Sequence, residues 1–202
     1  AALSLRGKTI GLIKQCALFE NPQTGISITD QSQISVDSCI LINCSIESTS
    51  TGRVTIIKGN TIDKTSGSIG ISLNQSTNGY IYHNKLKGCS IDLRGYTITI
   101  LSSNQYYGGS LIASDQTMVE ADNESFEGES PAAIGVRNNA QVTLKSSKLN
   151  NLNGIGIVTY DTSKITATSL TINGTSHQGI ICHSGSELEL QNVTIQETAE
   201  DS

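Results

Sequence analysis

The 202-residue chain contains no Trp, a single Met and two Pro, and Phe, Trp and Tyr together make up only 4% of it. Many clefts that cleave glycans use Trp to bind sugar units, so this composition disfavours that class of enzyme. Charged residues amount to 15% with a net charge of −5, so the backbone of a nucleic acid is not an expected partner. The sequence has no run of 18 apolar residues and no basic amphipathic segment, so we expect no membrane insertion.

The cysteines are odd in number and have no C-x-x-C spacing, so the sequence indicates neither a zinc site nor a disulfide framework. The five are Cys16, Cys39, Cys44, Cys89 and Cys182. Free cysteines usually behave as small buried residues, and we interpret these five in that way. A bridge between Cys39 and Cys44 stays open as an alternative.

What the chain does contain is a repeat. The stretch VTLKSSKL at 142–149 returns as ITATSLTI at 165–172 and again, after the same interval, as LELQNVTI at 188–195. A fixed period of this size usually decides the architecture. The last apolar residue of each unit can be followed towards the N-terminus as far as Leu18, which gives an average period of about 22 residues. We place these nine marks at Leu18, Ile46, Ile62, Leu86, Tyr106, Phe126, Leu149, Ile172 and Ile195.

Within each unit, apolar residues alternate with Ser, Thr, Asn or charged residues, as in 33–36, 53–56 and 97–100. This alternation is typical of half-buried strands, and no window sustains the spacing of an amphipathic helix. Each short strand can stack about 4.8 Å above its counterpart in the next turn, so successive turns share one core. We therefore predict an all-β parallel β-helix, a solenoid of about nine coils, forming one domain over residues 1–202.

In many units an Asn lies two or three residues before the apolar mark of the last strand. The residues are Asn43, Asn60, Asn84, Asn104, Asn123 and Asn192. Asn tolerates left-handed backbone angles, and its amide can bond to the amide of the coil above. We interpret these residues as a structural ladder at a corner of the coil.

These features resemble the right-handed parallel β-helices of the pectin-lyase-like superfamily. The resemblance rests on GISI at 25–28, GISLNQSTNGYIYHNKL at 70–86, GIGIV at 154–158 and GIICHSGSELELQNVTI at 179–195, and it covers roughly residues 10–198. It implies the fold and leaves the function open, because this architecture serves lyases, hydrolases, epimerases, phage spikes, adhesins and scaffolds. The N-T-D, D-D, G-H-G and R-I-K set of polygalacturonases and the W-I-D-H stretch of pectate lyases are absent. No catalytic residue is therefore carried over.

One candidate binding site is a column of side chains on the outside of the coils. Arg137, Tyr160 and His183 occupy the same step of three successive units, and aligning earlier units adds Arg94, together with Asn74 and Ser114. If the flanking apolar residues face the core, these positions face solvent. A guanidinium can pair with a carboxylate, so a polyanionic sugar chain is a suitable ligand. A decorated surface without a ligand is the alternative.

A second candidate lies in GYIYHNKL at 79–86. If Ile81 faces the core, Tyr80 and Tyr82 face out, and with Tyr106 and Tyr107 one coil later they would form an aromatic platform for stacking. The opposite register, with both Tyr80 and Tyr82 buried, stays open.

A third candidate is acidic. Residues 115–129 contain six of the 18 acids and no base. Glu120, Asp122 and Glu124 alternate, which would place them on one face of a strand, where clustered oxygen atoms can hold calcium. Lyases of the resembled superfamily often use calcium. The alternative is a solvated acidic rim, and no other cofactor is expected.

We expect a non-catalytic β-helix rod of a surface or secreted protein that binds a glycan or a protein along one face. Two alternatives stay open: a polysaccharide lyase or other carbohydrate-active enzyme of acidic glycans, and an intracellular scaffold for protein interactions. The chain has no initiating Met, signal peptide or evident capping helix. We therefore expect a section of a longer protein, and uncapped ends would allow oligomers to form.

Overall fold

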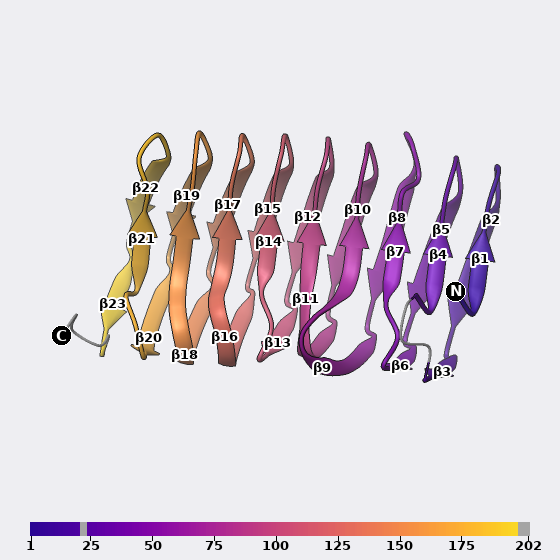
Figure 1. The fold of residues 1–202 in the computed structure, drawn as a ribbon, viewed down its shortest axis with the longest axis horizontal. Coiled ribbons are helices and arrows are strands. Elements are labelled where there is room, and N and C mark those ends of the chain that lie inside the picture. Colours follow the sequence, from indigo (N-terminus) through magenta and orange to yellow (C-terminus); the bar gives the residue numbers. More distant parts are fainter. Residues whose placement is uncertain (21–23, 198–202) are drawn as a thin grey trace.

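A computed structural model describes residues 1–20 and 24–197 as a rod of stacked coils built from parallel strands (Figure 1). The N-terminal coil lies at one end of the rod and the C-terminal coil at the other. Every strand pairs in parallel with its counterpart one coil away, and the described residues contain no helix. The predicted all-β parallel solenoid is therefore confirmed.

One side of the rod is a nine-stranded sheet to which each coil contributes one strand of five residues. Its strands are β2 (Ile10–Lys14), β5 (Gln33–Asp37), β8 (Val54–Lys58), β10 (Asn78–Tyr82), β12 (Ile98–Ser102), β15 (Met118–Asp122), β17 (Gln141–Lys145), β19 (Lys164–Thr168) and β22 (Glu187–Gln191). Val142 pairs with Ile165 and Ile165 with Leu188, so the core side chains of the three C-terminal repeats form one file.

The remaining strands form a fourteen-stranded sheet that wraps the rest of the core. They are β1 (Leu3–Leu5), β3 (Ala17–Phe19), β4 (Ile26–Ile28), β6 (Ile40–Ile42), β7 (Ile46–Ser48), β9 (Thr61–Leu73), β11 (Lys85–Leu93), β13 (Gln105–Tyr107), β14 (Leu111–Ala113), β16 (Ser125–Val136), β18 (Lys148–Thr159), β20 (Thr171–Thr175), β21 (Ile180–Cys182) and β23 (Thr194–Gln196). Each coil crosses this sheet twice, for example with β13 and then β14. In the longer strands β9, β11, β16 and β18 one continuous strand makes both crossings, and β9 swings outward between its two crossings (Figure 1).

Eight of the nine predicted marks lie in one file of strand partners, which Leu41 completes, and Ile46 is wrong. Leu18 pairs with Leu41, and Leu41 pairs with Ile62, so Leu41 holds the place assigned to Ile46. Ile46 instead opens β7 in the next part of the coil, opposite Ile26 and Ile71. Both Leu41 and Ile46 are fully buried, so apolar spacing alone could not separate them.

The corner after each strand of the nine-stranded sheet contains a left-handed residue, and in three successive coils the residue after it is an inward Asn. Gly59, His83 and Ser103 have positive φ, and the residues that follow them are Asn60, Asn84 and Asn104. These three amides are buried and form a ladder, with Nδ2 of each donating to the side chain one coil further on, at 3.0, 2.9 and 3.1 Å.

The predicted ladder is confirmed for those three residues and wrong for the others. Asn123 and Asn192 sit one residue earlier, at the left-handed position itself, with φ of 57° and 55°. Asn43 also has a positive φ but follows β6, outside this corner. Glu124 takes the place in the ladder that follows Asn104.

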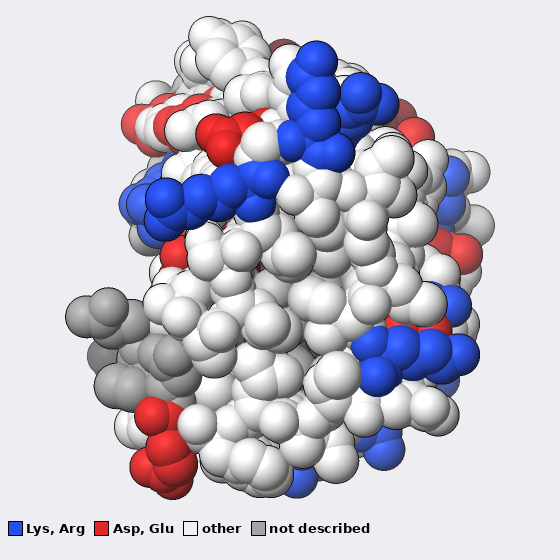
Figure 2. Space-filling view, turned by 90° about the vertical axis from the view of Figure 1, so that its right-hand side faces the viewer, with Lys and Arg blue, Asp and Glu red and all other residues white. Residues whose placement is uncertain are grey.

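The ends of the rod differ from its middle, because apolar core positions of the first coil have neighbours on one side only. Leu5, Ile13 and Leu18 are only partly buried there, although they pack on the core. Figure 2 looks along the rod at this end, where uncharged residues fill the centre and Lys and Arg lie around it. Among the described residues, no helix has the length and apolar character needed to span a bilayer.

Candidate functional site

The predicted column on the outer surface exists in the expected register. Val136, Thr159 and Cys182 are successive strand partners, so the residues that follow them lie next to one another along the rod, one in each coil. Those residues are Arg137, Tyr160 and His183, and all three are exposed. The rings of Tyr160 and His183 stack face to face, with centroids 4.4 Å apart and 11° between their planes.

Arg94 lies in the same column, but its charge is used within the protein. Its Nη2 lies 2.6 Å from Oδ2 of Asp92, whose side chain is 1% exposed. The hydrogen bond from Arg94 to Asp92, and then the charge of Asp92, raise the pKa of Arg94. Ser114, the next residue of the column, is buried and separates Arg94 from Arg137. The column therefore presents a continuous surface only from Arg137 to His183.

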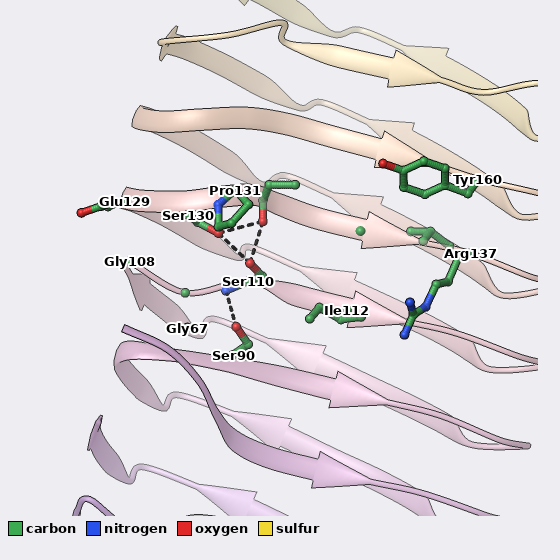
Figure 3. Close-up of a pocket in the computed structure, with 14 residues that line it drawn as sticks. Gly67, Ser90, Gly108, Ser110, Ile112, Glu129, Ser130, Pro131, Arg137 and Tyr160 are labelled. Atoms are coloured by element: carbon green, nitrogen blue, oxygen red, sulfur yellow. Dashed lines mark hydrogen bonds between the residues drawn. The ribbon is translucent and has the colours of Figure 1, made fainter. Parts of the chain in front are cut away.

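A hollow of about 470 Å³ opens beside Arg137 on the outer side of the fourteen-stranded sheet (Figure 3). Its origin is a change in coil length. Leu86, Tyr106 and Phe126 are successive strand partners, and the two coils that join them are shorter than the coil before Leu86 and the coil after Phe126. In the shorter coils the bend between the two crossings of the fourteen-stranded sheet is shorter. The longer bends of the neighbouring coils therefore project further outward and form the walls of the hollow.

Small residues keep the hollow open. Gly135 lies on the outer face between Ile112 and Val158, and a Cβ at Gly135 would meet nothing within 4 Å. Gly109 also lines the hollow, and it packs so closely on the backbone carbonyl of Cys89 that a Cβ could not be placed there. The hollow therefore has an apolar base of Gly135 and Ile112.

Serine hydroxyl groups line the end of the hollow opposite Arg137 (Figure 3). Ser110 and Ser130 are buried, and their Oγ atoms lie 2.6 Å apart. Each also lies within hydrogen-bond distance of the carbonyl oxygen of Ala132, at 2.6 and 2.8 Å. Ser110 and Ser130 have two hydroxyl protons for these three contacts, so at any moment one contact is not a hydrogen bond. The Oγ of Ser90 accepts a hydrogen bond from the backbone N–H of Ser110.

Charge is unevenly placed around the hollow. The Arg137 side chain extends along the sheet towards Ile112, and Glu129 at the other end points away from the hollow (Figure 3). Within the described part of the chain, Arg137 forms no ion pair. One end of the hollow is therefore cationic and the other offers neutral hydroxyl groups.

The predicted aromatic platform is not assembled. Ile81 is fully buried, so Tyr80 faces solvent as expected, and Tyr82 is half-buried with its ring at 5.6 Å from that of His83. Tyr106, however, is a core residue stacked on Phe126 at 4.1 Å. Its place in the platform is wrong because it belongs to the file of core marks.

Tyr107 is exposed, but it lies on β13 in the fourteen-stranded sheet, whereas Tyr80 and Tyr82 lie on β10 in the other sheet. The three exposed or half-buried rings therefore do not share one surface.

The predicted acidic face is correct for Glu120 and Asp122 and wrong for Glu124. The first two are exposed on β15. The positive φ of Asn123 turns the chain inward, so the Glu124 side chain is 1% exposed. Burial raises its pKa to about 8. Nowhere in the described ranges do three His, Cys, Asp or Glu side chains gather as a metal site would require.

The sequence reasoning identified Arg137 and Tyr160 but not the rest of the hollow. Ser90, Ser110 and Ser130 are evenly spaced, and their spacing equals the length of the coil from Leu86 to Tyr106. This equal spacing was the sequence signal that could have shown that the three serines lie side by side in successive coils. Gly135 offered none, because a glycine in a strand has several structural explanations.

Together, parallel strands, short regular coils and a corner ladder define a parallel β-solenoid. The model of a protein family described as right handed beta helix region matches residues 70–200, well over half of the chain. The chain therefore belongs to the right-handed β-helix family, in agreement with the resemblance to pectin-lyase-like proteins. No curated protein matches it.

Proposed function

We propose that this chain is a non-catalytic binding module that holds an acidic glycan in the hollow beside Arg137. The observation that carries the proposal is the arrangement around the hollow: the guanidinium at one end, Gly135 and Ile112 as base, and the hydroxyl groups of Ser110 and Ser130 at the other end. A uronate sugar has matching groups, namely a carboxylate, an apolar C–H face and ring hydroxyls.

The column extends this site along the rod. Tyr160 borders the hollow and stacks on His183 one coil further on. Coils follow one another at about 4.8 Å, so adjoining units of a sugar chain can lie along these rings. On this proposal the module works at a cell surface or after secretion, where it displays this face to the glycan.

The arrangement of charged groups favours binding over cleavage. General acid–base catalysis needs a titratable group within hydrogen-bond reach of the reacting atoms. Glu129 points away from the hollow, and the His183 ring lies on Tyr160 one coil beyond it. Arg137 can neutralise a carboxylate, but neither Glu129 nor His183 lies beside it to take the proton. Tyr160 does border the hollow, and we assign it a stacking role because its ring already lies flat on that of His183.

Calorimetric titration with oligouronates of several units tests the proposal. Arg137→Gln removes the charge-assisted hydrogen bonds, worth about 1.5–3 kcal/mol, so the affinity should fall about 10- to 100-fold. Arg53→Gln is the matched control, because Arg53 is exposed just before β8 in the other sheet. Equal affinities of both variants and the wild type would refute the assignment.

The same samples separate binding from the lyase alternative. A lyase would release an unsaturated uronate with new ultraviolet absorbance on prolonged incubation with the polymer. We expect no absorbance change with the wild type. Turnover that Arg137→Gln abolishes would replace the binding proposal with an enzymatic one.

A further inference from the structure

The outer face of the nine-stranded sheet carries an apolar patch that the binding site does not use. The patch lies on β8, β10, β12 and β15, where the first and third residues of each strand face solvent. Its members are Val54, Ile56, Tyr80, Ile98, Ile100 and Met118. Ile98 and Met118 are more than half exposed, at 56% and 51%. A contiguous exposed patch of this kind marks a contact surface.

The patch is centred between β10 and β12, the two middle strands of the four. Charged residues flank it in the fifth position of the strands on either side. Lys58 of β8 and Asp122 of β15 lie at equal distances from this centre, and so do Asp37 of β5 and Lys145 of β17. Each pair across the centre has opposite charges. The side chain of Asp37 is only 11% exposed and already pairs within the chain with Lys58 at 3.3 Å, so Lys58 and Asp122 are the more accessible pair across the centre.

We propose that this face is the interface of a homodimer whose two-fold axis runs parallel to the strands and passes between β10 and β12. Rotation about this axis lays the sheet on a second copy with the coil order reversed. Residues at the same position in neighbouring strands form a row across the sheet, and each row then faces the same row of the partner copy: first positions face first positions, and third positions face third positions. Tyr80 meets Ile100, Val54 meets Met118, and Lys58 meets Asp122.

The charges select this axis over its neighbours. An axis through β12 would set Lys58 against Lys145, and an axis through β10 would set Asp37 against Asp122. Both arrangements bring like charges together, which is unfavourable in an interface. For the axis through β10 this effect is smaller, because Lys14 and Lys58 already pair with Asp37 within the chain at 3.8 and 3.3 Å. A two-fold axis along the rod is also disfavoured, because it would place the row of Ile98 and Met118 against the polar row of Ser102 and Asp122.

The contact is small. Six strands from β5 to β17, each of five residues, cover about 29 Å by 16 Å. This footprint is at the low end for specific interfaces, so we expect a reversible dimer with a dissociation constant on the order of tens of micromolar. The hollow lies on the fourteen-stranded sheet and stays accessible in this dimer, so the dimer does not depend on the proposed glycan site.

Sedimentation velocity from about 1 to 500 µM, which brackets this constant, tests the dimer. The wild-type 21.4 kDa chain should shift towards twice that mass as the concentration rises. Ile100→Asp should raise the dissociation constant at least tenfold. Ile40→Asp should leave it unchanged, because Ile40 is exposed to a similar degree, 49% against 42%, on the other sheet. Thermal unfolding of both variants verifies that the fold is retained.

Two further variants test the orientation. Asp122→Lys would oppose Lys58 of the second copy and should weaken the dimer several-fold, whereas Glu127→Lys makes the same charge change on the other sheet without effect. The proposed axis also places the charged Glu120 opposite the apolar Ile56, so Glu120→Leu should tighten the dimer.

A monomer at every concentration would overturn the proposal. So would association that survives Ile100→Asp, because it would have to use another surface such as the ends of the rod. A dimer weakened by Ile100→Asp but insensitive to Asp122→Lys and Glu120→Leu would refute the axis.

Discussion

Replacing the buried Glu124 by Gln should remove a pH-dependent weakness from the middle of the rod. Oε1 of Glu124 accepts two hydrogen bonds from Asn104, from the backbone N–H at 3.2 Å and from Nδ2 at 3.1 Å. Its Oε2 and the phenol oxygen of Tyr106 are buried and have no hydrogen-bond partner among the described residues. The side chain therefore satisfies the ladder as an acceptor but leaves its second oxygen without a bond.

Burial is the main cause of the raised pKa of Glu124, and the hydrogen bonds from Asn104 oppose it. The folded protein thus holds a proton that the unfolded chain releases. This group's contribution to stability is fully present below pH 4.5 and is lost as the pH rises towards 8. Between pH 4.5 and 7 the loss is about 3 kcal/mol, from 1.36 kcal/mol per pH unit and a pKa of about 8 in the fold.

Gln keeps the acceptor and does not titrate. Urea unfolding at pH 5, 7 and 8.5 should therefore show that Glu124→Gln gains stability relative to the wild type as the pH rises, by a few kcal/mol in total. Asp37 has a lowered pKa, foremost through its hydrogen bond from Ser38, and affects both proteins equally at acid pH. The difference between wild type and variant therefore isolates Glu124.

Glu127→Gln provides the control for net charge, because Glu127 is an exposed residue of β16, the strand that begins directly after Glu124. It should leave the pH dependence of stability close to that of the wild type. A stability difference between wild type and Glu124→Gln that is constant from pH 5 to 8.5 would refute the reasoning.

Three further predictions concern other parts of the rod. Asn84→Ala interrupts the corner ladder on both sides and should lower the free energy of unfolding by about 2–3 kcal/mol in urea titrations, because buried donors lose their acceptor. The expected burial of all five cysteines is wrong for Cys16 and Cys182, which are exposed. Thiol titration of the native protein should therefore detect these two quickly and Cys89 only on unfolding, because burial raises the pKa of Cys89 to about 12. Gly135→Val should fill the hollow, abolish oligouronate binding in calorimetry and leave the melting temperature nearly unchanged, because a Cβ there meets nothing.

The sequence predicted the solenoid because stacking imposes a period. A core residue must lie above its counterpart, and eight of nine marks therefore fell in one file. Ile46 failed because Leu41 and Ile46 are both apolar, both buried and close together in the chain, so periodicity gave two equally good registers. Only the pairing of Leu41 with Leu18 and Ile62 decides between them.

A corner explains the error at the acidic candidate site. Alternation places residues two apart on the same face only while the backbone stays extended. Asn123 breaks that condition, so Glu124 enters the core although Glu120 and Asp122 do not. Where the backbone stays extended the rule holds: Asp92 near the end of β11 and Arg94 directly after it, also two apart, pair with each other.

The position of the hollow follows from differences between coils rather than from the repeat itself. Strands must keep register, so an added or missing residue can be absorbed only in a bend. The two short coils from Leu86 to Phe126 lie between longer coils, and the missing residues leave a depression that Ser110 and Gly109 line. In this chain the constant part of the period predicts the fold, while its departures predict where a ligand can lie. A shortened coil that left no depression would contradict this rule, and lengthening the bend at Gly109 by a few residues should close the hollow and abolish binding.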